Sequence, residues 1–185
     1  MHKLVLVGDG GVGKTALRRT YMGESFDTNY LSTIGADFSV KTITNGSLTL
    51  KFQMWDMSGQ QHFEPVRQMF YGGTEGVVFV FDITRLDTLE NFPYWLEEIK
   101  RHNPNPAQIV IFGNKSDRRE EAFQNLPNKL EFDWGQPKKI SVFYTSALTG
   151  ENVQEGFEHL FNLLSAPQNQ QEEVPSSNNR SPLRT

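Results

Sequence analysis

The sequence predicts an α/β domain with a mostly parallel six-stranded sheet, one antiparallel edge strand and helices on both faces. Apolar runs of strand length alternate along the chain with amphipathic segments of helix length, as in parallel strands joined by crossover helices. One interruption of this alternation, at Asn45-Gly46, indicates a hairpin, which supplies the antiparallel edge strand. A chain of 185 residues has the usual size of one domain.

Six segments have strand patterns. Short apolar runs occupy residues 4–7, 77–81 and 109–112, and a weaker run occupies residues 142–144. The stretch 36–55 alternates instead, and it is divided by Thr44-Asn45-Gly46-Ser47. Because Asn-Gly supplies the positive φ angles of a tight turn, its two halves are predicted to be antiparallel neighbours.

Three helices are predicted between the strands, at residues 14–22, 86–101 and 152–164. The last of them places five apolar residues on one stripe: Val153, Phe157, Leu160, Phe161 and Leu164. In the middle helix, Asp87 or Thr88 is the expected N-cap. Pro93 fits that helix only if it lies in the first turn.

The rest of the chain has weaker patterns. Between residues 118 and 139, Pro127 and Pro137 flank an expected short helix around Leu130. After Leu164 the sequence is rich in Gln, Asn, Ser, Pro and Glu and has almost nothing to bury. We therefore expect a folded domain of residues 1–164 and a disordered tail of residues 165–185.

Charge and composition exclude several classes of protein. A net charge of -4 and a pI of about 5.6 provide no basic field, so nucleic acid is not an expected partner. Cysteine is absent, which excludes disulfides, zinc thiolate sites, thiol nucleophiles and prenyl or palmitoyl attachment. No signal peptide or membrane-spanning run is visible. We expect a cytoplasmic protein without an intrinsic membrane anchor, in which any recruitment to membranes would be through partners.

The first predicted strand runs into Gly8-Asp9-Gly10-Gly11-Val12-Gly13-Lys14-Thr15, which fits G-x-x-x-x-G-K-[ST] between a strand and a helix. The glycines let successive main-chain N–H groups point at phosphates, and the helix N-terminus adds partial positive charge. Lys14 is expected to reach the β and γ phosphates, and Thr15 to bind Mg²⁺. An ordinary glycine-rich turn is the alternative, which the eight-residue fit disfavours.

A second motif, Trp55-Asp56-Met57-Ser58-Gly59-Gln60, follows a predicted strand. Asp56 is expected to hold magnesium through water, and the Gly59 N–H to reach a γ phosphate. Gln60 is a neutral amide that can orient an attacking water. Alone, such a D-x-x-G sequence is more often a solvated turn; beside the phosphate loop, the nucleotide interpretation is favoured.

A third motif, Asn114-Lys115-Ser116-Asp117, is expected to select the base. The Asp117 carboxylate can accept from both N1–H and the 2-amino group of guanine, a donor pair that adenine lacks. Ser146-Ala147-Leu148, after the last strand, would add a main-chain N–H to guanine O6. A guanine nucleotide is therefore the predicted ligand.

These motifs in this order, with residues 30–38 between the first two, resemble the Ras superfamily of small GTPases over residues 3–164. The Ile-Gly-x-Asp-Phe sequence and the Trp before Asp56 are most similar to the Rab family. The resemblance implies a G domain of the P-loop NTPase type that slowly hydrolyses GTP to GDP with Mg²⁺. It also implies effector proteins, an exchange factor and a GTPase-activating protein as partners.

The resemblance assigns further roles. Thr33 would bind magnesium and sense the γ phosphate, Phe26 would pack against guanine, and Tyr30 would close over the phosphates. Phe38, Trp55 and Tyr71 match an aromatic triad presented to effectors. Half-buried sheet residues are an equal alternative for these three aromatics.

Departures from the family pattern bear on turnover. Met57-Ser58 and Gln61-His62-Phe63 lie beside the catalytic glutamine, and the tail lacks the cysteines that Rab proteins prenylate. Gly10 leaves space for a partner's arginine, and no arginine of this chain is obviously placed as an internal finger. A pseudo-GTPase that holds nucleotide without turnover is one alternative. A P-loop kinase is another, opposed by Asp117 and by the lack of an arginine-rich lid.

Overall fold

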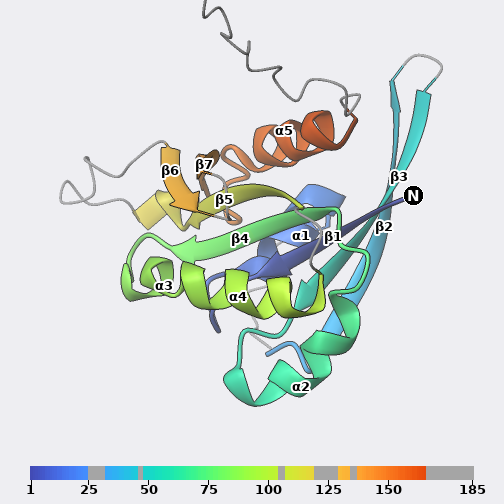
Figure 1. The fold of residues 1–185 in the computed structure, drawn as a ribbon. Coiled ribbons are helices and arrows are strands. Elements are labelled where there is room, and N and C mark those ends of the chain that lie inside the picture. The colour runs from blue at the N-terminus through green and yellow to red at the C-terminus, as the bar shows by residue number, and fades with distance from the viewer. Residues whose placement is uncertain (25–31, 46–47, 104–106, 119–128, 134–136, 166–185) are drawn as a thin grey trace, which may run out of the picture.

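The computed structural model describes residues 1–24, 32–45, 48–103, 107–118, 129–133 and 137–165, of which residues 45, 48, 129–133 and 137–139 are described by their backbone alone. Its centre is a sheet in the order β2-β3-β1-β4-β5-β7-β6 (Figure 1). The strands are β1 His2–Val7, β2 Ala36–Asn45, β3 Leu48–Met57, β4 Gly76–Asp82, β5 Gln108–Asn114, β6 Lys129–Asp133 and β7 Pro137–Thr145. The helices are α1 Lys14–Met22, α2 Glu64–Arg67, α3 Asp87–Glu90, α4 Phe92–His102 and α5 Val153–Ser165. Short 3₁₀ turns cover Gln61–Phe63, Gln68–Phe70 and Ser116–Arg118.

The predicted strand pairing is found for five parallel strands and for the antiparallel strand at one edge of the sheet. β3, β1, β4, β5 and β7 pair in parallel, and β2 pairs antiparallel with β3 at the edge of the sheet. The α/β class, the mostly parallel sheet and the antiparallel edge strand are therefore confirmed. The tip of the predicted hairpin, residues 46–47, lies outside the described residues.

The opposite edge carries one strand more than the six predicted. β6 pairs antiparallel with β7, with Leu130 opposite Ile140, so the described part of the sheet has seven strands. The expected helix around Leu130 is wrong. Residues 129–133 alternate polar and apolar, which is the two-residue period of a strand, and this local pattern decides the structure between the two prolines.

The predicted middle helix is divided at Asn91 into α3 and α4. Pro93 lies in the first turn of α4, where its missing N–H costs nothing. Neither Asp87 nor Thr88 caps α3, whose N-cap is Leu86. The buried Thr88 hydroxyl instead accepts the Asp82 main-chain N–H at 3.0 Å, which ties the helix to the end of β4.

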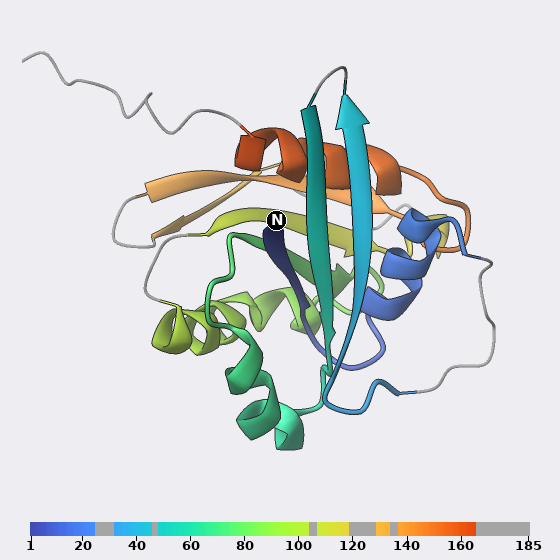
Figure 2. The same cartoon turned by 90° about the vertical axis from the view of Figure 1, so that its right-hand side faces the viewer.

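Two apolar clusters cover the two faces of the sheet. Alternate residues of β1 separate between them, because Leu4 and Leu6 belong to one cluster and Val5 and Val7 to the other. α1 and α5 pack on the first face, and α4 packs on the second (Figure 2). Helices on both faces are thus confirmed. Within the described residues, no helix has the length and apolar character that a bilayer span requires.

The predicted apolar stripe of α5 is confirmed. Val153, Phe157, Leu160 and Phe161 are buried, and Leu164 is partly buried against the same cluster. The fit beneath this helix is close: a Cβ added to Gly156 would lie 2.5 Å from the Phe112 ring. α5 can therefore approach β5 to this distance only with glycine at position 156.

The predicted motifs all lie together, at the carboxyl ends of parallel strands. The phosphate loop follows β1, the Asp56 motif ends β3, and the Asn114 and Ser146 motifs follow β5 and β7. Since these strands are parallel, their carboxyl ends meet, which is where open α/β sheets bind ligands.

Candidate functional site

The loop between β1 and α1 has a shape that depends on glycine. Gly8 and Gly13 have φ angles of 133° and 103°, which side chains rarely adopt. Space is also lacking, because a Cβ would lie 2.1 Å from the Val80 carbonyl oxygen at Gly8 and 2.2 Å from Asn114 Nδ2 at Gly13. The loop therefore curls tightly between two neighbouring strands, as a phosphate cradle requires.

Lys14 folds back over this loop. Its side chain is 6% exposed, and Nζ donates to the carbonyl oxygens of Gly8 at 2.7 Å and Asp9 at 2.8 Å. Burial lowers the pKa of Lys14 to about 8, although the carboxylates of Asp56 and Asp9 oppose the shift. The cation is thus held at the loop by main-chain acceptors that a phosphate oxygen could replace.

Three oxygen-bearing side chains from separate segments converge beside Lys14. Thr15 Oγ1 lies 3.0 Å from Thr33 Oγ1 and donates to Asp56 Oδ2, and Thr33 Oγ1 lies 3.4 Å from the same carboxylate oxygen. Asp56 is fully buried, and its Oδ1 has no hydrogen-bond partner among the described residues. Burial raises the pKa of Asp56, partly offset by Thr15 and Lys14.

This donor set fits Mg²⁺. Mg²⁺ prefers oxygen ligands and keeps several waters, so two hydroxyls and one carboxylate suffice when phosphate oxygens complete the shell. A cation there would also satisfy the orphaned Asp56 oxygen and offset the cost of burying its charge. In the described part of the chain, no cluster of three His, Cys, Asp or Glu residues offers a metal site of another kind.

The second residue of the phosphate loop, Asp9, directs its carboxylate away from the loop. Trp95 Nε1 donates to Asp9 Oδ1 at 2.9 Å, and Asn91 Nδ2 donates to Oδ2 at 2.7 Å. Both donors come from the start of α4. Asp9 can therefore offer its main-chain N–H to a phosphate, while its acid binds the neighbouring helix.

The Gly59 main chain lies directly against the phosphate loop. A Cβ at Gly59 would lie 2.3 Å from the Asp9 carbonyl carbon and 2.5 Å from the Gly10 nitrogen. Gln60 follows with an exposed side chain, and its main-chain carbonyl accepts from Arg67 Nη1 at 2.7 Å. The predicted γ-phosphate donor and the predicted catalytic amide are thus adjacent to the loop that would hold the phosphates.

The unusual residues before Gly59 are accommodated inside the domain. Met57 is fully buried in the α4-side core, and Ser58 is buried with its main-chain N–H donating to the Gly35 carbonyl at 2.8 Å. That hydrogen bond joins the Thr33 segment to the Gly59 segment. Gln61-His62-Phe63 form a short 3₁₀ turn leading into α2.

At the other end of the site, Asn114 connects loops instead of facing an exposed base pocket. Its Nδ2 donates to the Val12 carbonyl at 2.8 Å, and its Oδ1 accepts the Ala147 N–H at 3.1 Å. Asp117 is exposed, and its Oδ1 accepts from Ser146 Oγ at 2.5 Å. The Asp117 carboxylate, which is predicted to select the base, and the Ser146 loop are therefore neighbours.

Two residues that the sequence motifs did not identify lie beside the site. The buried Asp82 accepts from Lys115 Nζ at 2.6 Å; burial alone would raise its pKa, but hydrogen bonds from Lys115 and Thr84 hold the pKa below its usual value. Arg85 Nη2 donates to the Gly10 carbonyl at 3.2 Å. Arg85 therefore contacts the phosphate loop through a main-chain carbonyl, a contact that the sequence did not predict.

The aromatic triad is only partly at the surface. Phe38 is 51% exposed and stacks on the half-buried Trp55, with ring centroids 5.0 Å apart. Tyr71 is fully buried, so its expected presentation at the surface is wrong, because Glu98 accepts its hydroxyl within the core at 2.7 Å. The half-buried Phe70 lies next to Trp55 instead, at 4.8 Å.

Some predicted positions are not placed. Phe26, Tyr30 and the tail from residue 166 lie outside the described residues. Leu148 is described and is 58% exposed at the Ser146 loop. Val12 is fully buried, so only its main chain can face a phosphate.

Three features together define a G domain of the P-loop NTPase type: a glycine-rich loop that leads into α1, an Asp near the end of β3, and the Asn114-Lys115-Ser116-Asp117 motif at the end of β5. Comparison with known proteins narrows this class. The sequence profile described as "Ras family" matches residues 3–166.

Individual relatives support the same family. The chain is 35% identical to Ras-related protein Rab-8B of Homo sapiens over 159 residues, which cover 85% of this chain and 75% of that protein. Ras-related protein Rab-13 of Canis lupus familiaris is 35% identical over 160 residues, covering 86% and 78%. GTP-binding protein YPT1 of Saccharomyces cerevisiae is 32% identical over 157 residues, covering 85% and 75%. The chain belongs to the Ras family of small GTPases and is Rab-like.

Proposed function

We propose that this chain is a molecular switch that binds GTP with Mg²⁺ and slowly hydrolyses it to GDP. The convergence of Thr15, Thr33 and Asp56 beside Lys14 is the observation that carries the proposal. It brings together three segments that are distant in sequence. A cation shared by them and by a γ phosphate would connect all three to the state of the nucleotide.

Guanine selection rests on Asp117. An exposed carboxylate next to Ser146 has acceptors free for the N1–H and 2-amino group of guanine. Adenine lacks this donor pair, so binding it would forgo both hydrogen bonds to the Asp117 carboxylate. Asn114 then acts by holding the Val12 and Ala147 main chains in place.

Hydrolysis would proceed by in-line attack of water on the γ phosphate, with magnesium neutralising charge on the phosphate oxygens. Lys14 exchanges its two carbonyl acceptors for phosphate oxygens, whose negative charge favours its protonated form. Gln60 orients the water, and the Gly59 N–H stabilises charge that develops on the γ phosphate.

Loss of the γ phosphate would release Thr33 and Gly59, and the surface next to them would change shape. The hydrogen bond from Ser58 to Gly35 means that the two segments move together. Effectors would read this change through a surface that includes Phe38 and Trp55. An exchange factor and a GTPase-activating protein are the further partners expected of such a switch.

A nucleotide-locked module without turnover is the competing function. Met57 and Ser58, which depart from the family pattern, leave this alternative open, but both side chains are buried. The presence of Gln60, Thr33 and Lys14 supports turnover. We therefore favour hydrolysis over passive binding.

A single-turnover experiment tests the proposal. Purified protein is loaded with GTP, and phosphate release after Mg²⁺ addition is followed in the wild type and in Gln60→Leu. Faster release by the wild type supports a GTPase, whereas equal rates point to the locked module. Competition of GTP against ATP by fluorescence, measured on the same preparation, contradicts guanine selection if ATP competes equally.

A further inference from the structure

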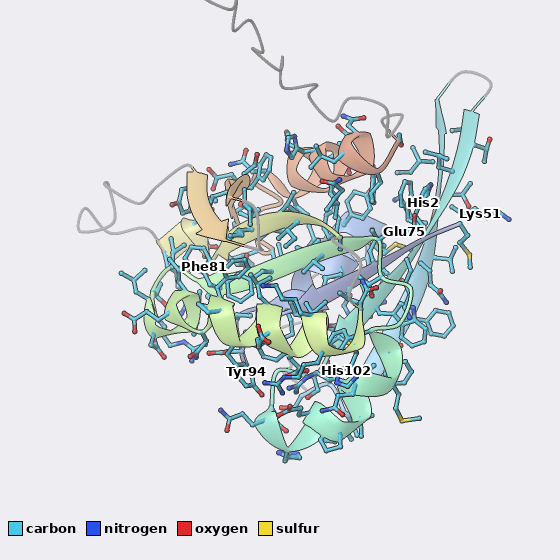
Figure 3. All side chains as sticks on the ribbon, in the orientation of Figure 1. His2, Lys51, Glu75, Phe81, Tyr94 and His102 are labelled. Atoms are coloured by element: carbon cyan, nitrogen blue, oxygen red, sulfur yellow. The ribbon has the colours of Figure 1, made fainter. Side chains whose placement is uncertain are left out.

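A fully buried ion pair connects α2 to α4 behind the phosphate loop. Arg67 and Glu98 are both 0% exposed. The pair is bidentate, because Arg67 Nε donates to Glu98 Oε1 at 2.8 Å and Nη2 donates to Oε2 at 2.7 Å. α4 carries the labelled Tyr94 and His102, with α2 below it in the view of Figure 3.

The remaining guanidinium nitrogen binds the main chain on both sides of Gly59. Arg67 Nη1 donates to the Ser58 carbonyl at 3.0 Å and to the Gln60 carbonyl at 2.7 Å. Gly59 itself lies against Asp9 and Gly10 of the phosphate loop. One buried cation therefore fixes the segment that contains the γ-phosphate donor and the catalytic amide.

Neighbouring groups hold the pair in this orientation. Tyr71 Oη donates to Glu98 Oε1 at 2.7 Å, and the Arg67 guanidinium lies 4.6 Å from the centre of the Trp95 ring. Burial alone would lower the pKa of Arg67, but Glu98 and Tyr71 raise it, so the group remains charged. Trp95 also binds Asp9, so α4 contacts the phosphate loop and the Gly59 segment together.

Stability alone does not account for this arrangement. Burying two charges is costly, and apolar residues of similar volume often stabilise a core as well as a buried ion pair does. Apolar side chains cannot donate to the carbonyls of Ser58 and Gln60, however. The charged pair thus fixes the main chain at Gly59. An apolar core would leave the carbonyls of Ser58 and Gln60 without donors.

We infer that Arg67 and Glu98 are positioning residues that hold Gly59 and Gln60 ready for the γ phosphate. This inference rests on the proposed function of the same site. A prearranged Gly59 N–H strengthens binding of a triphosphate and does nothing for a diphosphate, which has no γ phosphate. The pair should therefore raise the preference for GTP over GDP, as well as the rate of hydrolysis.

The decisive measurement is the ratio of two affinities. Arg67→Met/Tyr71→Phe/Glu98→Leu replaces the network by apolar groups, and dissociation constants are measured for GDP and for the β,γ-imido analogue of GTP. We expect affinity for the analogue to fall about tenfold, with affinity for GDP within about twofold of the wild type. A network that only supports the fold would change both affinities equally or neither, and either result overturns the inference.

Two further variants complete the design. Arg101→Met removes a surface arginine of α4 that also reaches α2, through Glu64 at 3.6 Å, and it should leave the ratio unchanged. If the triple variant does not fold, Arg67→Lys keeps the charge and loses the forked donors, so the same shift in the ratio is expected. An unchanged ratio in a folded Arg67→Lys protein overturns the inference.

Hydrolysis is the second readout. Single-turnover phosphate release by the triple variant should fall about tenfold, while Arg101→Met retains the wild-type rate. If the wild type releases no phosphate, the proposed GTPase activity fails, but the affinity ratio still decides whether Arg67 and Glu98 position Gly59. The two failures are thus distinguishable.

Discussion

The Asn114 side chain joins the phosphate loop to the base-selecting end of the site, because its Nδ2 donates to the Val12 carbonyl at 2.8 Å. Its other end accepts the Ala147 N–H, and the side chain is 2% exposed. The β1–α1 loop, β5 and the Ser146 loop therefore share one amide. This connection fixes the β1–α1 loop relative to the Ser146 loop.

Asn114→Ala should weaken GDP and GTP binding together, by about tenfold to 100-fold. Two buried main-chain groups lose their partners, and each unsatisfied group costs about 1–3 kcal/mol. Equilibrium titration with fluorescent GDP and GTP analogues checks this. A selective loss of GTP alone would contradict the role given to Asn114.

Asp117→Asn should exchange the base preference. An amide in place of the carboxylate can donate to the 2-oxo group of xanthine and no longer accepts both guanine donors. Affinity for GTP is expected to fall at least about 100-fold, with xanthosine triphosphate bound in preference. Competition between the two triphosphates measures the exchange, and an unchanged preference for guanosine would refute the base assignment.

Thr33→Ala and Thr15→Ala should differ in the nucleotide for which they lower the affinity. Both hydroxyls lie at Asp56. The proposed switch, however, makes only the Thr33 segment dependent on the γ phosphate. We expect Thr33→Ala to lower affinity for the GTP analogue about tenfold and to spare GDP, and Thr15→Ala to lower both affinities. Equal effects of Thr33→Ala on the two nucleotides would argue against its proposed role.

Removal of Mg²⁺ with EDTA should accelerate GDP release by about tenfold or more, because the buried Asp56 carboxylate would then face the phosphates without a cation. Stopped-flow fluorescence of a GDP analogue follows the rate, and excess Mg²⁺ should restore it. Release that is indifferent to EDTA would contradict the Thr15, Thr33 and Asp56 site.

Gly156→Ala should destabilise the domain by about 1–3 kcal/mol, since the new methyl group would overlap the Phe112 ring. Gly72→Ala is the matched control, because a Cβ there meets no atom within 4 Å in the described structure. Thermal unfolding measures both variants. Adding Phe112→Leu to Gly156→Ala should recover part of the loss by making room.

Sequence patterns predicted the local parts of this molecule well. The loop around Lys14 is one continuous motif in a fixed strand and helix context, so its position at the edge of the sheet followed from eight residues. The strands and the α5 stripe followed from periodicity. The segment 129–133 was missed because two nearby prolines outweighed its short alternation.

Contacts between distant residues were beyond sequence reasoning. Asn114 and Val12 are 102 residues apart, Trp95 and Asp9 are 86 apart, and Arg67 and Glu98 are 31 apart. No local pattern records such pairs, because folding alone brings them together. Tyr71 was misplaced for the same reason: whether a tyrosine faces solvent depends on an acceptor such as Glu98, which belongs to another helix.

The orientation of Asp9 explains how a loop built for anions can contain an acid. A carboxylate turned inward would repel the very phosphates that the loop gathers. Hydrogen bonds from Trp95 and Asn91 turn the Asp9 carboxylate toward α4, whereas the Lys14 ammonium lies at the carbonyls of the loop itself. Substituting Trp95 would therefore release the Asp9 carboxylate to turn toward the nucleotide. The loss of an uncharged side chain would then change the charge at the site.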